Sequence, residues 1–397
     1  MAPQRTIVQE LIAAEEAGMP ARFGVRSTVR IGRQQGIVIG LDNGNDALKI
    51  AVLTTDGTLI TLRIPTAYRV AAMIRGGESE VSYSVDGSPA FWIGETALRH
   101  DGDDLPIGPT HQRITDPRLP PVIGAGLAEL LHKAGYEPGA YNIILGFAIP
   151  NTEIVPVRGE GEGEGERLGV NPETRDVLEK HMKGAAWSVE RTDADGSVTG
   201  WKLTILSVMP QAQTTGTLVA VTKAPNGTTV TDVEEMDIVD IGGGDLQLTT
   251  VQIKPIYRMT TRRLGEGTIR VARALKDKFP RHELNDVAAQ QALITKRLLV
   301  SGRLRNISAE VEEVLNSQGQ AIIGTVLPVL RQSRRFVTIT GGGVILLHEL
   351  LKPRLDADSK VRGEDYELIN HGIASVVNSI GVLFTVIFRA AAATKRG

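Results

Sequence analysis

The feature of this sequence that most constrains the fold is a short unit that occurs twice. In each copy, an apolar strand pattern ends in an acidic residue beside a glycine turn, and a second strand pattern follows the turn. The first copy is Leu41-Asp42-Asn43-Gly44, and the second copy is Val239-Asp240-Ile241-Gly242. Because two copies of one supersecondary unit indicate a duplicated structure, we expect an α/β chain with two similar lobes that face each other.

Length and composition limit the kind of protein. The chain has 397 residues, which predicts two or more domains. Its formal net charge of −2 and its aromatic fraction of 4% argue against direct binding to nucleic acid, which relies on basic surfaces and stacking rings. The chain has no cysteine, so disulfides and thiolate metal sites are excluded, and a cytoplasmic location is expected.

Neither end of the sequence predicts a membrane segment. Residues Thr6 to Ala17 read as an amphipathic helix whose polar face is acidic, whereas helices that lie on membranes favour Lys and Arg there. We expect this helix to dock on its own domain, with a filament or partner contact as the alternative. The apolar run from Ile380 to Phe388 is too short to span a bilayer and predicts a buried core helix.

The two acidic turns suit a triphosphate bound with Mg²⁺. Such a ligand needs backbone amides near its phosphates, hard oxygen ligands for the metal, a cation and a group that orients the attacking water. Asp42 and Asp240 are the expected metal ligands, Lys49 is the expected phosphate-binding cation, and Gln211, after a strand and a Met-Pro step, is the expected water-orienting residue. The glycines that would let backbone amides approach phosphate or ribose are Gly44, Gly242, Gly243, Gly244, Gly341, Gly342 and Gly343.

Each element alone also occurs in ordinary turns, and only their order along one chain is specific. In that order the sequence resembles the actin superfamily and, within it, the ParM-like plasmid-segregation actins of bacteria. The resemblance covers residues 37 to about 390. It rests on a first phosphate motif (Leu41 to Lys49, with Asn43 and Asn45), a second phosphate motif (Asp240 to Gly244), an adenosine motif (Thr340 to Gly343) and two connecting segments (Val208 to Gln211, Asn370 to Ala374).

The resemblance implies a duplicated, ribonuclease-H-like, two-lobed ATPase fold. It implies an N-terminal extension over 1–36, domain I over 37–211, domain II over 212–372, and a C-terminal helix over 373–397 that returns to domain I. The implied cofactors are ATP and Mg²⁺, with GTP as an open alternative, and Lys296 is an expected nucleotide contact on its helix.

Two stretches depart from the family pattern. Asp245 and Gln247 stand where the second phosphate motif usually has Thr or Ser and then Asp. A carboxylate at the first position would repel phosphate unless it faces Mg²⁺ or points away. The acidic glycine repeat Gly159 to Glu166 is extra to the pattern, and we expect it to be a mobile surface loop without a catalytic role.

The resemblance also implies a function. It is that of an ATPase whose subunits assemble head to tail, a contact that generates an open helix, and whose slow hydrolysis then weakens the filament. Such filaments segregate plasmid DNA through a DNA-binding adaptor of ParR type, without direct contact to DNA or membrane. The alternative is a non-polymerising small-molecule kinase of the same superfamily, for which the sequence shows no recognisable catalytic base.

Overall fold

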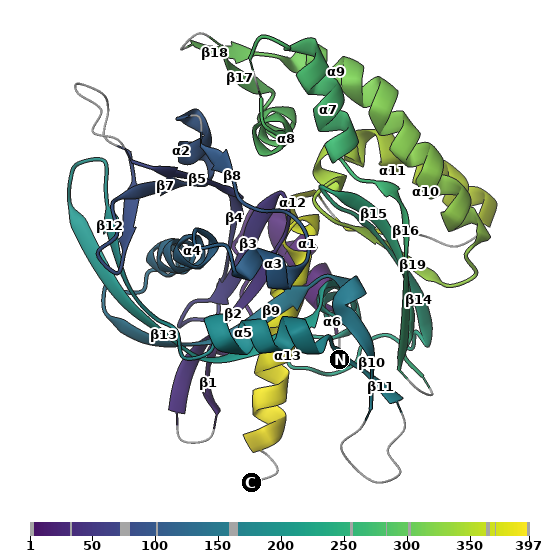
Figure 1. Ribbon diagram of the computed structural model, residues 1–397. Coiled ribbons are helices and arrows are strands. Elements are labelled where there is room, and N and C mark those ends of the chain that lie inside the picture. Colours follow the sequence, from purple (N-terminus) through teal and green to yellow (C-terminus); the bar gives the residue numbers. More distant parts are fainter. Residues whose placement is uncertain are drawn as a thin grey trace. The chain divides into compact units, whose positions relative to one another are not determined.

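The computed structural model describes residues 4–394 except for 32–33, 72–79, 101, 159–165, 255–256, 283, 301–302, 363–365 and 370. The chain packs as two compact units (Figure 1). Unit 1 comprises Met1–Val230 and Asn378–Gly397, and unit 2 comprises Thr231–Val377. Residues 212–230 therefore pack with unit 1, while the division into four segments stays a prediction of domain organisation.

Unit 1 is built on an 11-stranded mixed sheet. Its strands are β1 (Thr28–Ile31), β2 (Gln34–Asn43), β3 (Ala47–Leu53), β4 (Leu59–Pro65), β5 (Ala67–Val70), β6 (Ser82–Val85), β7 (Phe91–Ile93), β8 (Asp103–Asp104), β9 (Ala140–Ile149), β12 (Ala186–Thr192) and β13 (Val198–Ala212). They follow the order β4-β3-β2-β9-β13-β12-β6-β7-β5-β8, and β1 pairs with β2 outside this path. A separate hairpin joins β10 (Ile154–Arg158) to β11 (Glu166–Val170).

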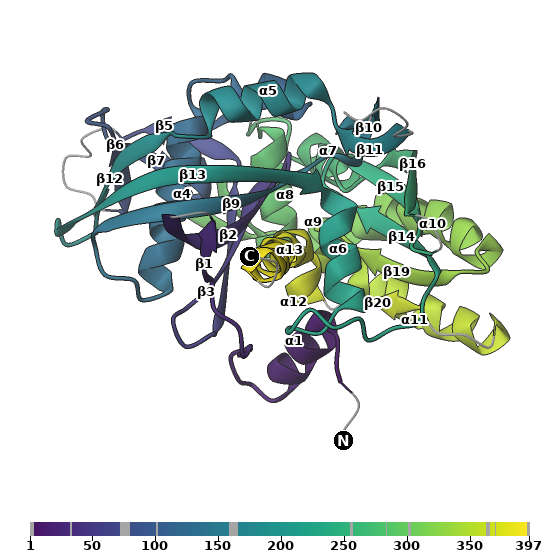
Figure 2. The same ribbon diagram turned by 90° about the horizontal axis from the view of Figure 1, so that it is seen from below.

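Helices cover both faces of this sheet. They are α1 (Ile7–Glu16), α2 (Gly94–Arg99), α3 (Thr110–Ile114), α4 (Leu119–Lys133), α5 (Pro172–His181), α6 (Gln213–Thr222) and α13 (Val377–Thr394), with a 3₁₀ turn η1 (Asn151–Glu153). Leu48 and Ile50 point toward α4, so by strand alternation Gly40 faces the other way, where α13 lies (Figure 2).

Unit 2 is built on a five-stranded sheet in the order β16-β15-β14-β19-β20. The strands are β14 (Glu235–Ile241), β15 (Asp245–Gln252), β16 (Arg258–Glu266), β19 (Phe336–Thr340) and β20 (Glu367–Leu368), and a separate hairpin joins β17 (Arg297–Val300) to β18 (Arg303–Asn306). The helices are α7 (Ile269–Lys278), α8 (Asp286–Thr295), α9 (Ser308–Val314), α10 (Gln320–Gln332), α11 (Val344–Arg362) and α12 (His371–Ala374), with a π turn η2 (Leu315–Gly319).

The two units repeat one five-stranded arrangement. In unit 1, β4, β3 and β2 pair antiparallel in turn, and β9 and β13 then continue the sheet in parallel. In unit 2, β16, β15 and β14 pair antiparallel, and β19 and β20 continue in parallel. Helices connect the parallel strands in both copies. The duplicated α/β fold predicted from the two acidic turns is confirmed.

Glycines allow α6 and α13 to touch through their backbones. A Cβ on Gly381 would lie 1.8 Å from the Gly216 carbonyl oxygen, and a Cβ on Gly216 would lie 2.4 Å from the Asn378 carbonyl oxygen. The Thr217 hydroxyl donates to Asn378 Oδ1 over 2.7 Å beside this crossing. Any side chain at Gly216 or Gly381 would therefore push the two helices apart.

Both terminal helices expected from the sequence are present. Helix α1 buries Ile7, Val8 and Leu11, and the Ile7 amide donates to the Lys223 carbonyl, so the helix docks on its own unit. The run Ile380 to Phe388 lies inside α13 as expected. Within the described part of the chain, no helix is long and apolar enough to cross a membrane.

One boundary differs from the sequence-based expectation. Gln211 was expected to follow a strand, but β13 continues through Ala212. Beyond Ser207 this strand pairs with β9 alone, because the β12 pairing ends at Thr204. Pro210 is tolerated because its missing N–H falls where one side of the strand has no partner strand. The expected mobile loop lies mostly outside the described residues, since 159–165 are among the gaps.

Candidate functional site

In unit 1, the first acidic turn joins β2 to β3. Asp42 lies opposite Lys49 in the strand register, and the Gly44 amide closes the turn by donating to the Ala47 carbonyl over 3.1 Å. No described residue accepts a hydrogen bond from the backbone amides of Asn45 and Asp46 at the tip. Asn43 Nδ2 is also buried without a partner among the described residues. The turn thus offers several unsatisfied donors to an anion.

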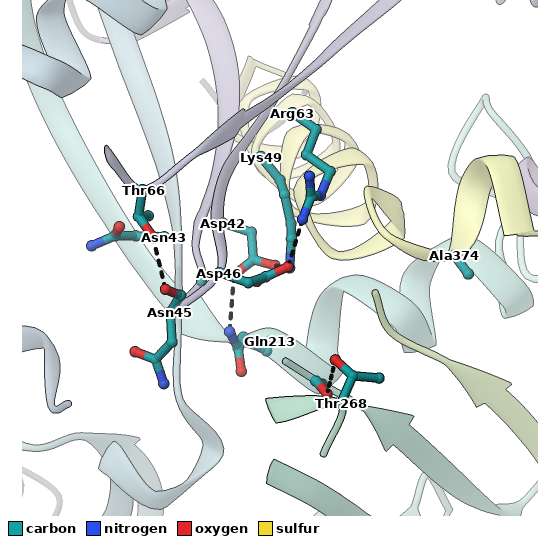
Figure 3. Close-up of polar contacts among 12 residues, drawn as sticks. Asp42, Asn43, Asn45, Asp46, Lys49, Arg63, Thr66, Gln213, Thr268 and Ala374 are labelled. Carbon is teal, nitrogen blue, oxygen red and sulfur yellow. Dashed lines mark hydrogen bonds and ion pairs between the residues drawn. The ribbon is translucent and has the colours of Figure 1, made fainter. Parts of the chain in front are cut away.

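A buried charge cluster lies beside this turn (Figure 3). Lys49 Nζ is 3.3 Å from Asp46 Oδ1 and 3.9 Å from Asp42 Oδ2, and Arg63 is 3.0 Å from Asp46 Oδ2. Burial alone would raise the pKa of the Asp46 carboxyl, but Lys49 and Arg63 outweigh it and hold that pKa below its usual range. Two carboxylates and two cations balance each other, so an incoming phosphate would compete with Asp46 for Lys49.

Arg113 on α3 fixes the shape of the turn from behind. Its guanidinium donates to the Asn43 carbonyl, to Asn43 Oδ1 over 2.7 Å and to the Gly44 carbonyl over 2.8 Å. The residue is 3% exposed. Burial lowers the pKa of Arg113 to about 10, against the opposing effect of Asp42, Asp46 and Glu153, so the side chain stays charged at neutral pH.

The two candidate glutamines occupy different environments. Gln211 is 4% exposed inside β13, and neither atom of its side-chain amide has a partner among the described residues. Gln213, the first residue of α6, donates from Nε2 to Asp42 Oδ1 over 2.9 Å, as Figure 3 shows. The contacts place Gln213, two residues beyond the expected position, next to the acidic turn.

In unit 2, the second acidic turn joins β14 to β15 with the same geometry. The Gly242 amide donates to the Asp245 carbonyl over 2.9 Å, as Gly44 donates to Ala47 in unit 1. The amides at the start of α7 hold the turn from outside, with Gly267, Thr268 and Ile269 donating to the carbonyls of Gly244, Gly242 and Gly243. In the part of the chain that the structure describes, the Gly243 and Gly244 amides have no acceptor. Both repeats therefore leave two tip amides open.

Asp245, the departure from the family pattern, is held within its own strand. Its Oδ2 accepts from Gln247 Nε2 over 2.5 Å, and Gln247 lies opposite Asp240 in the strand register. The carboxylate therefore makes its hydrogen bond to the other departing residue, so the two substitutions form a pair.

The third glycine turn lies against Asp240. Gly341 has φ of +101°, and a Cβ there would meet Asp240 Oδ1 at 2.2 Å. The Gly343 amide donates to the Ile241 carbonyl over 2.7 Å, and α11 begins at Val344. The conformation and the close contact both require glycine at 341, because any side chain would displace the carboxylate.

The structure brings most of the expected residues together within their own units. Asp42, Asn43, Gly44, Asn45 and Lys49 share the first turn, while Asp240 and the six glycines of unit 2 share the second. Lys296 does not join them: it is exposed, with φ of +54°, at the C-terminal cap of α8. Three residues near the turns were missed by the sequence analysis, namely Asp46, Arg63 and Arg113.

The donor set fits a hydrated Mg²⁺ bound with phosphate. Each unit offers a carboxylate beside two open amides. Among the described residues, no three His, Cys, Asp or Glu side chains are grouped as a metal cage. Because Mg²⁺ usually keeps several waters and binds through one or two carboxylates plus substrate phosphates, the absence of a cage in these residues suits it.

The duplicated sheets and paired acidic turns define a mixed α/β fold of the actin-like ATPase class. No protein-family model matches the chain, and no curated protein matches its sequence significantly. The fold is shared with solved structures of an archaeal actin homologue and of ParM proteins.

The archaeal actin homologue Ta0583 superposes with a TM-score of 0.57 at 16% identity, covering 91% of this chain and 99% of that one. ParM of Bacillus thuringiensis, solved with ATP, gives a TM-score of 0.58 at 14% identity, covering 92% of this chain and 100% of the other. The apo ParM protein of pSK41 gives 0.56 at 14% identity, covering 89% and 98%. At these identities the likeness concerns the fold.

Proposed function

We propose that the chain is an ATP-dependent, filament-forming, actin-like protein of the cytoplasm that hydrolyses ATP slowly and drives the segregation of DNA. The fold supports this proposal, because similar structures include ParM bound to ATP and Ta0583 bound to ADP. A DNA-binding adaptor of ParR type would connect the filament to DNA, which suits the net charge of −2.

The observation that carries the proposal is the repeated acidic turn with two open amides at its tip. In the proposed mechanism the amides of Asn45, Asp46, Gly243 and Gly244 bind phosphate oxygens. Asp42 and Asp240 orient the water shell of Mg²⁺, which supplies charge neutralisation when it is bound. Lys49 exchanges its contact with Asp46 for a phosphate oxygen.

A side-chain amide next to Asp42 suits slow hydrolysis. Gln213 already donates to the Asp42 carboxylate, so its carbonyl oxygen is left to accept from a water. A glutamine has no pKa near neutrality, so it orients the water without removing a proton. Slow turnover leaves subunits time to assemble head to tail before hydrolysis weakens the contact.

Sedimentation with MgATP, with MgADP and without nucleotide tests the proposal. We expect pelleting filaments with MgATP, visible by electron microscopy, and a decline in light scattering as phosphate is released. A protein that binds and consumes ATP but stays monomeric in every condition would refute filament formation and would match the small-molecule kinase alternative. A protein that binds no nucleotide would refute the assignment of the turns.

A further inference from the structure

Strand β16 carries an unpaired row of arginines on an open sheet edge. It is the end strand of the unit 2 sheet, and no strand in the described residues pairs with its outer side. Arg258, Thr260 and Arg262 are exposed, and the register with β15 puts all three on one face. In the described part of the chain, neither Arg258 nor Arg262 has an ion-pair partner. We call Arg258, Thr260 and Arg262 the basic strip.

The same chain contains a segment with the complementary pattern. Between β10 and β11, the sequence alternates glycine with Glu160, Glu162, Glu164 and Glu166. Side chains at every second position share one side of an extended chain. When extended, this acidic repeat therefore presents a row of carboxylates with the same spacing as the basic strip.

We propose that the acidic repeat of one copy of the chain adds as an antiparallel strand to the basic strip of a second copy. In this register Glu164 lies opposite Arg258, Glu162 opposite Thr260 and Glu160 opposite Arg262. The open edge of β16 supplies backbone hydrogen bonds, and the charge pairs fix the register. The contact joins two different surfaces, so it repeats along an open assembly. This inference rests on the proposed function, which requires such an assembly.

The competing explanation is that the arginines only protect the edge. Charged side chains on an edge strand prevent pairing between identical edges. That explanation makes no use of the acidic repeat, so the two explanations differ when charges are exchanged between the two segments.

The test uses two charge-reversal variants of the full chain. The strip variant carries Arg258→Glu and Arg262→Glu, and the repeat variant carries Glu160→Lys and Glu164→Lys. A combined variant carries all four changes and keeps the net charge of the wild type. A control variant, Arg297→Glu with Arg303→Glu, reverses two other exposed arginines that have no ion-pair partner among the described residues. Association is measured by sedimentation velocity with and without MgATP, at low and high ionic strength.

We expect each two-residue variant to raise the concentration for half-maximal association roughly tenfold or more at low ionic strength. The combined variant and an equimolar mixture of the strip and repeat variants should both recover association, because both restore opposite charges at every contact. The control should associate like the wild type, and salt should weaken wild-type association.

Three results would overturn the inference. If both variants associate like the wild type, the basic strip only protects the edge. If the combined variant recovers but the mixture does not, the contact forms within one chain. If the control loses association equally, net charge is the cause. MgATP binding, followed with a fluorescent analogue, is measured on each variant: intact binding and polymerisation that ignore these charges refute this inference alone, whereas a wild type that neither binds nor polymerises refutes the proposed function.

Discussion

At the scale of single residues, two glutamines two positions apart have different environments. Gln211 is enclosed in β13, while Gln213 begins α6 and reaches Asp42. The sequence predicted an amide in this segment but placed it two residues early, because the strand was expected to end near Val208. A strand that keeps only one partner leaves no clear end signal in its sequence, and Pro210 looked like a boundary.

Replacement of Gln213 should slow hydrolysis without preventing binding. Gln213→Ala removes the amide beside Asp42, so we expect phosphate release to fall on the order of tenfold or more, while MgATP affinity and polymerisation persist. Gln211→Met is the matched control, and it should keep hydrolysis within about twofold and leave stability unchanged or higher, since it removes a buried amide without partners among the described residues. The reverse pattern would return the role to Gln211.

Glu367 should make stability depend on pH. Burial raises the pKa of this β20 carboxyl from 4.5 to about 7, against a hydrogen bond from Thr338. Because the folded chain then binds more protons than the unfolded chain between these values, the free energy of unfolding should fall as pH rises from about 4.5 to about 7 and stay lowered above it.

Glu367→Gln should remove that loss. We expect the variant to exceed the wild type by about 1–2 kcal/mol at pH 8 and to match it near pH 5, measured by thermal unfolding at both pH values. Glu349→Gln on α11, where the carboxylate is 94% exposed, should show no such difference. An advantage of Glu367→Gln that is equal at both pH values would contradict the titration of this carboxyl.

At the scale of elements, the strands of the duplicated core were predictable and the peripheral strands were not. β2, β3, β14 and β15 are apolar runs that end at glycine turns. By contrast, β5 to β8 are two to four residues long, which is too short for an alternating pattern to emerge. Strand β16 was missed because its sequence is rich in arginine and threonine, and its pairing with β15 is what makes it a strand.

The contact between α6 and α13 should tolerate no side chain at its glycines. Gly381→Ala would force a methyl group against the Gly216 carbonyl, so we expect a loss of about 2 kcal/mol or more. Urea unfolding followed by tryptophan fluorescence reports on this unit, since all three tryptophans lie in unit 1. Gly24→Ala, where a Cβ meets nothing within 4 Å, should cost far less. Equal losses would show that the helices can shift apart.

At the scale of the whole molecule, the duplication makes Asp42 and Asp240 equivalent residues of the two repeats. We expect Asp42→Asn and Asp240→Asn each to weaken Mg²⁺-dependent nucleotide binding at least tenfold, measured by calorimetry with and without Mg²⁺. Asp245→Asn is the matched control: its carboxylate already accepts from Gln247, so the affinity should change by less than about threefold. Tight MgATP binding by Asp240→Asn would refute the proposed role of the pair.

The sequence predicted the residues of the turns themselves, because a glycine turn after a strand is a local signal. It could not predict the residues that hold the first turn, which come from distant elements: Arg63 from β4 and Arg113 from α3. Their roles depend on tertiary packing, and nothing in their immediate neighbours distinguishes them from surface arginines. Lys296 shows the opposite limit, since its helix was predicted but its side chain is exposed.

Unit 2 is one continuous stretch of chain, inserted into a unit 1 that is completed only by α13. Until α13 arrives, Gly40 on β2 and Gly146 on β9 face water instead of Leu383 and Val382. Contacts between such distant segments form late in folding, so the inserted unit should reach its native state first. A fragment of residues 231–377 should therefore fold alone by circular dichroism, whereas a fragment of residues 1–230 should aggregate unless a peptide of residues 378–397 is added.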